Sequence, residues 1–166
     1  MKYLIDTNIL IQAKNIHYRM STFSCIWQWL QETSEVKILD AVFTEILRQD
    51  DELKDWVINL HELNPEKFLV STDIDTQYYY GEVSEHVMAN YEAGDARNNF
   101  LSPIKADAKL IAKTLALSSD NDKHCIINAE TPNRSTSKPS IPNVCKHFGV
   151  NYKSFYDVLE DLNASF

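Results

Sequence analysis

Short apolar runs alternate along the chain with longer segments in which apolar residues recur every three or four positions. The runs hold three or four residues each and are rich in side chains that favour strands. Such runs are typical of strands buried on both faces of a sheet. They occupy residues 3–5, 36–39, 68–70 and 125–127. Strands that alternate with helices predict a parallel sheet flanked by helices, an α/β fold.

The segments between these runs predict helices, because their apolar positions repeat with helical spacing. We expect helices over residues 9–14, 20–30, 42–60, 73–91, 104–117, 144–148 and 154–162. The last has Ser154 and Asp157 at the spacing of a capping box. We expect loops over residues 92–103 and over the Ser/Pro-rich stretch 131–142. No repeat or break in composition divides the chain, so residues 1–166 should form a single domain.

The composition is typical of a soluble globular protein. The 166 residues are 44% hydrophobic and 24% charged, and no apolar stretch approaches the ~20 residues that a membrane helix needs. Only a three-residue apolar run precedes Asp6, so we expect no signal peptide. The three cysteines are odd in number and far apart, which argues against disulfides or a zinc knuckle and favours the cytoplasm. With three glycines, the chain has no phosphate-binding loop of the G-x-x-x-x-G-K type.

The formal net charge of −8 counts against an extended nucleic-acid-binding surface, since such surfaces are usually basic. Part of the negative charge can belong to an acidic cluster that binds cations and thereby reverses the local field. The charge also favours a basic partner. Solubility alone is the competing explanation of the same charge.

Two aspartates occupy unusual positions. One lies where a ligand can bind, and the other lies where burial of a carboxylate costs free energy. Asp6 directly follows the first apolar run and precedes a helix for which Asn8 is a good N-cap, so it lies at the edge where open α/β sheets bind ligands. Asp107 opens a helix and faces the same side as Leu110 and Ile111, which is costly unless something pairs with it. The structural alternatives are helix capping for Asp6 and attraction to the helix dipole for Asp107.

Two glutamates complete a set of four acids at the ends of predicted strands. Glu45 follows the second run and is expected in the first turn of the next helix, where a solvent-facing role is the alternative. Glu130 ends the stretch that continues the run 125–127. In a parallel sheet these positions share the carboxyl edge, so the four side chains can converge. Converging carboxylates repel one another unless cations bind, and Mg²⁺ or Mn²⁺ is the expected ion.

Four motifs in this order, "YLIDTNIL", "DAVFTEIL", "KADAKLIAKTLA" and "IINAE", resemble the acidic motifs of the PIN-domain ribonucleases. The match covers most of the chain. The closing "IPNVCKHFGV" and "FYDVLEDL" are similar to a toxin-like branch long described as a family of unknown function. The chain departs from the PIN pattern at the last acid, where it has Glu130 in place of the usual aspartate.

The resemblance implies a three-layer α/β/α PIN-like fold with a central parallel sheet of about five strands. It also implies a metal-dependent ribonuclease, with RNA as substrate, and often a cognate antitoxin, which the charge suggests is small and basic. A homodimer is a further expectation, and a membrane partner is not expected.

Each acid then receives a role in hydrolysis of a phosphodiester bond. Asp6 and Asp107 are the expected metal ligands, Glu130 completes a second ion site, and Glu45 holds a metal-bound water or acts as base. Supporting residues are Thr7 and Asn8, which orient Asp6 or a water. Candidate substrate contacts are Arg134 and Lys138, in the polar loop that follows Glu130.

Two other functions compete with this interpretation. A phosphatase of the haloacid dehalogenase type also begins with strand-Asp, but it needs a second aspartate where this chain has Asn8. A non-catalytic PIN-like scaffold that binds protein or RNA is the stronger alternative, since Glu130 is the feature that a degenerate site would have lost or shifted. Covalent catalysis is disfavoured because no Ser/His/Asp set with a strand-turn-helix nucleophile signature is present.

Overall fold

The computed structural model describes residues 1–166 and contains one sheet of five strands in the order β3-β2-β1-β4-β5. Every neighbouring pair of strands is parallel. The strands are β1 (Tyr3–Ile5), β2 (Val36–Leu39), β3 (Phe68–Leu69), β4 (Cys125–Ile127) and β5 (Asn151–Lys153). β1 lies at the centre and all its residues are buried, as its short apolar run predicts.

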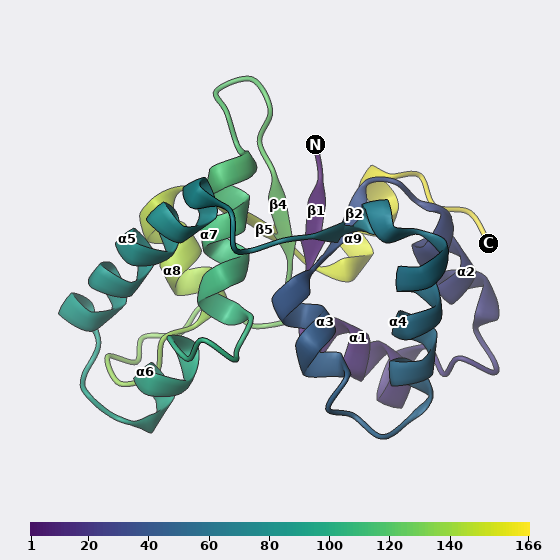
Figure 1. Ribbon diagram of the computed structural model, residues 1–166, viewed down its shortest axis with the longest axis horizontal. Coiled ribbons are helices and arrows are strands. Elements are labelled where there is room, and N and C mark those ends of the chain that lie inside the picture. The colour runs from purple at the N-terminus through teal and green to yellow at the C-terminus, as the bar shows by residue number, and fades with distance from the viewer.

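Helices cover both faces of the sheet, which gives three layers (Figure 1). On one side lie α5 to α8, and on the other lie α1 to α4 and α9. Their bounds are α1 (Thr7–Gln12), α2 (Ser24–Glu32), α3 (Asp40–Ile46), α4 (Glu52–Leu63), α5 (Ile74–Asn90), α6 (Asp95–Phe100), α7 (Asp107–Leu117), α8 (Ile141–Phe148) and α9 (Phe155–Asp161). A π-helical turn, Ala13–His17, continues α1, and a 3₁₀ turn, Pro65–Lys67, precedes β3. The predicted three-layer α/β/α PIN-like fold is therefore confirmed.

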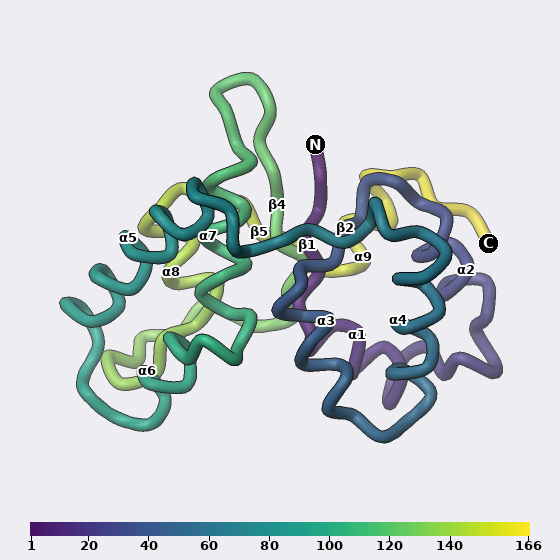
Figure 2. The backbone as a smooth tube through the Cα atoms, in the orientation of Figure 1, coloured from purple at the N-terminus to yellow at the C-terminus, as the bar shows by residue number.

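The carboxyl ends of the strands share one edge of the sheet. Figure 2 shows the N-terminus and the loop between α7 and β4 at the opposite, amino end, with the chain running through β1 toward α1. One cluster of 34 buried apolar residues surrounds the strands. No helix combines the length and the apolar character needed to cross a membrane.

The prediction of one helix over residues 42–60 is wrong, because two helices occupy this stretch. α3 ends at Ile46, and Asp51 starts α4 by accepting a hydrogen bond from the Leu53 N–H at 3.0 Å. The apolar stripe continues across the break, since residues of both helices face the core. Hydrophobic spacing alone therefore does not reveal where the backbone turns.

Three further elements differ from the sequence expectation. The stretch 92–103 contains α6, which buries its one large apolar side chain, Phe100. β5 has polar, half-exposed residues and carries no apolar run, because it lies at the edge of the sheet. α8 begins at Ile141, inside the predicted loop, after the cap Ser140. By contrast, the Ser154–Asp157 capping box of α9 is present as predicted.

Candidate active site

Asp6 lies at the carboxyl end of β1, in the N-cap position of α1, and is only 2% exposed. Its side chain makes no capping hydrogen bond, and its Oδ2 atom is buried without any hydrogen-bond partner. Helix capping therefore does not explain this carboxylate. A buried acceptor without a donor is costly, which makes it a good position for a cation. The helix begins at Thr7, so Asn8 is not the cap but an exposed residue of the first turn.

Asp107 is the first residue of α7, and it lines the same hollow as Asp6. Burial raises the pKa of Asp6 to about 8, with further contributions from the negative charges of Asp107, Glu130 and Glu45. Burial also raises the pKa of Asp107 to about 6, and Glu45 and Glu130 add to the effect. The smaller contributions, from neighbouring negative charges, indicate that these acids repel one another when ionised.

Glu45 lies in the second turn of α3, later than the first turn expected for it. Its Oε2 accepts a hydrogen bond from the Thr7 hydroxyl, and its Oε1 accepts one from the Ala106 N–H at 3.2 Å. The Lys105 Nζ lies 3.9 Å from the same Oε1. Glu45 thus ties α1, α3 and the start of α7 together. Thr7, expected to orient Asp6 or a water, instead donates to Glu45.

Glu130 is exposed and is not among the residues that line the hollow. It lies at the rim of the acidic edge, the carboxyl edge of the sheet that carries Asp6, Glu45 and Asp107. Its Oε2 accepts a hydrogen bond from the Ile141 N–H at 3.1 Å, at the start of α8. Its own N–H donates to Asn128 Oδ1 at 3.0 Å. Glu130 contributes negative potential to Asp6 and Asp107, but one of its oxygens is already engaged in holding α8.

The hollow has a volume of about 160 Å³ and contains two cations that the sequence did not indicate, Arg48 and Lys105. Arg48 follows Glu45 by three residues, and Lys105 precedes Asp107 by two, so proximity to the acids in sequence was the available signal. Arg134 and Lys138 are exposed in the later loop and do not line the hollow. The complete lining is Asp6, Thr7, Asn8, Ile11, Glu45, Arg48, Gln49, Lys105 and Asp107.

The carboxylates of Asp6 and Asp107 supply some of the oxygen ligands that a hard divalent cation needs. The unpartnered oxygen of Asp6 and the raised pKa values of Asp6 and Asp107 mark two carboxylates whose ionised forms a cation would stabilise. No group of three or more His, Cys, Asp or Glu side chains is arranged to hold a metal ion. Two carboxylates suit only an ion such as Mg²⁺, which keeps several waters and takes one or two carboxylates from the protein.

Comparison with solved structures finds a protein with a similar fold. The chain is similar to a chain in the crystal structure of VapBC2 from Rickettsia felis bound to a DNA fragment from their promoter. The TM-score is 0.51 at 13% sequence identity, over 93% of this chain and 99% of the other. No curated protein matches the sequence. The family model described as "Domain of unknown function (DUF4411)" matches residues 3–166. The chain belongs to this family.

Proposed function

We propose that this protein is a metal-dependent endoribonuclease of the PIN type and the toxin of a toxin–antitoxin pair. The observation that carries the proposal is a pair of acids in one hollow at the carboxyl edge of the sheet, the buried Asp6 and the half-buried Asp107. Ligands of open parallel sheets bind at this edge. The similarity of the fold to that of a chain in the VapBC2 structure supports the toxin assignment.

The residues that line the hollow would have different roles in phosphodiester hydrolysis. Asp6 and Asp107 would hold the cation, which when bound supplies charge neutralisation and an activated water. Lys105 and Arg48 lie in the same hollow and can bind phosphate oxygens of the RNA strand. Glu45 borders the hollow and can accept a proton from the attacking water. Its bonds to Thr7 and Ala106 keep its position fixed.

The test is cleavage of a single-stranded RNA pool by the purified protein. We expect cleavage with Mg²⁺ or Mn²⁺ present and none after EDTA is added, because the acidic pair repels the phosphodiester without a cation. A protein that is inert on a broad RNA pool at several metal concentrations would instead support the scaffold function. The structural feature that favours the scaffold is Glu130, whose oxygen is bonded to α8.

A small basic antitoxin fits the acidic edge. The net charge of −8 steers a basic segment toward the protein, and an arginine that reaches Asp6 and Asp107 can form a bidentate pair in place of the ion. We therefore expect binding of the partner to weaken with added salt and to compete with Mn²⁺. The measurement is co-purification from the native host, followed by titration of the complex with salt and with Mn²⁺. A partner that binds equally well at high salt and with saturating Mn²⁺ would contradict inhibition at the carboxylates.

A further inference from the structure

A second cavity, of about 200 Å³, lies on the other side of α1 from the acidic hollow. Asn8 and Ile11 of α1 face the acidic hollow, whereas Ile9 and Gln12 line the second cavity. At about 30 Å³ per water, the space holds roughly six or seven water molecules, which is the size of one flat heterocycle. Its lining is Ile9, Gln12, Ala13, His17, Tyr18, Asn128, Ala129, Ser154, Phe155 and Tyr156.

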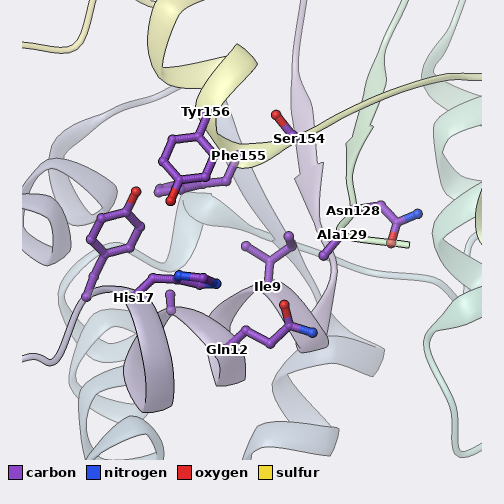
Figure 3. A pocket seen from close by; sticks show the side chains of 10 residues that line it. Ile9, Gln12, His17, Asn128, Ala129, Ser154, Phe155 and Tyr156 are labelled. Carbon is purple, nitrogen blue, oxygen red and sulfur yellow. The ribbon is translucent and has the colours of Figure 1, made fainter. Parts of the chain in front are cut away.

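Aromatic rings stand on both sides of this cavity. Figure 3 shows the His17 imidazole on one side and the Phe155 and Tyr156 rings on the other. Tyr18 completes the aromatic wall, with ring centroids 6.0 Å from Phe155 and 6.2 Å from Tyr156. The wall is apolar in its faces and polar at its edges, and the Gln12 amide adds a group able to donate and accept hydrogen bonds. Planar bases bind single-strand sites through this combination of stacking and edge contacts.

The backbone around the cavity holds these rings in place. His17 ends the π-helical turn Ala13–His17, a distortion that is frequent at functional sites. The Tyr18 carbonyl accepts a hydrogen bond from Trp27 Nε1 at 2.7 Å. Phe155 and Tyr156 follow the capping residue Ser154, whose hydroxyl accepts from the Asp157 N–H. The cavity is thus built from three segments that are distant in sequence.

The cavity and the acidic hollow meet at the ends of two neighbouring strands. Asp6 follows β1, and its N–H donates to the Ile127 carbonyl of β4 at 3.0 Å. The next residues of that chain, Asn128 and Ala129, line the aromatic cavity. Because neighbouring strands are ~5 Å apart, the residues that follow β1 and β4 place the two hollows next to each other at the carboxyl edge of the sheet.

We propose that this cavity binds one base of the RNA strand whose backbone lies in the acidic hollow, and that it sets the base preference of cleavage. The inference rests on the proposed function. A base is favoured over an apolar protein side chain because the cavity adjoins the acidic edge and combines stacking faces with the polar edges of His17 and Gln12.

The experiment measures binding without depending on cleavage. Fluorescence anisotropy is recorded for 2′-O-methyl RNA hexamers in Mg²⁺, with one abasic position moved along the strand and the integrity of each oligonucleotide checked afterwards. For the wild-type protein, one abasic position should weaken binding about ten-fold, within the range of one base–aromatic stack. The double variant His17→Ala/Tyr156→Ala should bind weakly and show no dependence on position. Both side chains are exposed, so the fold should persist, as circular dichroism can verify.

Matched controls are Ile16→Ala and Tyr78→Ala, which remove exposed side chains outside the cavity and should keep the positional effect. Tyr156→Phe retains the ring and should also keep it. Equal binding of all abasic hexamers by the wild-type protein, or a positional effect that survives in the double variant, would overturn the proposal. The proposal would also be overturned if an inhibitor protein covers His17 and Tyr156 and replacement of these two residues does not change RNA binding. Positional binding without any RNA cleavage would uphold the base site and remove the nuclease function, whereas cleavage without positional binding would remove the base site alone.

Discussion

Replacing Asp107 by Asn is expected to reduce metal-dependent RNA cleavage by about 100-fold or more, on the scale of losing one charged or polar group at a reacting centre. The substitution keeps the size of the side chain and removes the charge that would hold the cation beside Asp6. Asp107 sits in the first turn of α7, where a negative charge stabilises a helix by only ~0.3–1 kcal/mol, so its loss should leave the protein folded. The measurement is the initial rate on a labelled single-stranded RNA at saturating Mn²⁺.

Asp95→Asn is the matched control, because Asp95 also stands in the first turn of a helix but is exposed and outside the hollow. This variant should cleave RNA at the wild-type rate. An Asp107→Asn protein that is folded and cleaves within a few-fold of wild type would remove Asp107 from the metal site.

Replacing Asp6 by Asn is expected to stabilise the metal-free protein at pH 8. The pKa of Asp6 is raised from its ordinary value of 3.8 to about 8, so the folded state binds this proton more tightly than the unfolded chain does. The contribution of Asp6 to the stability of the metal-free protein is then fully present below about pH 4 and is lost as the pH rises, until the pH passes about 8. The loss amounts to several kcal/mol, at about 1.4 kcal/mol per pH unit.

Asn carries no charge, so the Asp6→Asn variant should escape this loss and melt about 5–10 °C above the wild type at pH 8. Mn²⁺ should raise the melting temperature of the wild type, because it binds the folded state alone, and should leave the variant almost unchanged. The measurement is a pH series of thermal unfolding with EDTA and with Mn²⁺. A variant with the same pH dependence and the same Mn²⁺ response as the wild type would show that Asp6 neither repels its neighbours nor binds the ion.

The positions of Asp6 and Asp107 could be predicted from the sequence because each breaks a pattern. Asp6 interrupts an apolar run at the point where a buried strand must end. Asp107 places a charge on the apolar face of its helix. Parallel topology then brings strand ends to one edge, and the structure lines one hollow with Asp6, Asp107 and Glu45. Local pattern and sheet geometry were sufficient for this part of the site.

Other parts depend on contacts that no local pattern encodes. The hydrogen bond from the Ile141 N–H to Glu130 requires α8 to pack against the end of β4. The Thr7–Glu45 contact depends on the packing of α1 against α3. β5 is recognisable only through its pairing with β4, because its residues are polar. The aromatic cavity joins residues from both ends of the chain, which sequence spacing cannot bring together.

If Asp6 and Asp107 together hold a divalent cation, anomalous diffraction from crystals soaked in Mn²⁺ should locate the ion between them. We expect a strong anomalous peak between the two carboxylates, at ordinary metal–oxygen distances, with waters completing the coordination. The same soak of Asp107→Asn crystals should show a weakened peak or none. A well-ordered hollow without any peak at saturating Mn²⁺, or a peak only at other residues, would show that Asp6 and Asp107 do not hold the ion.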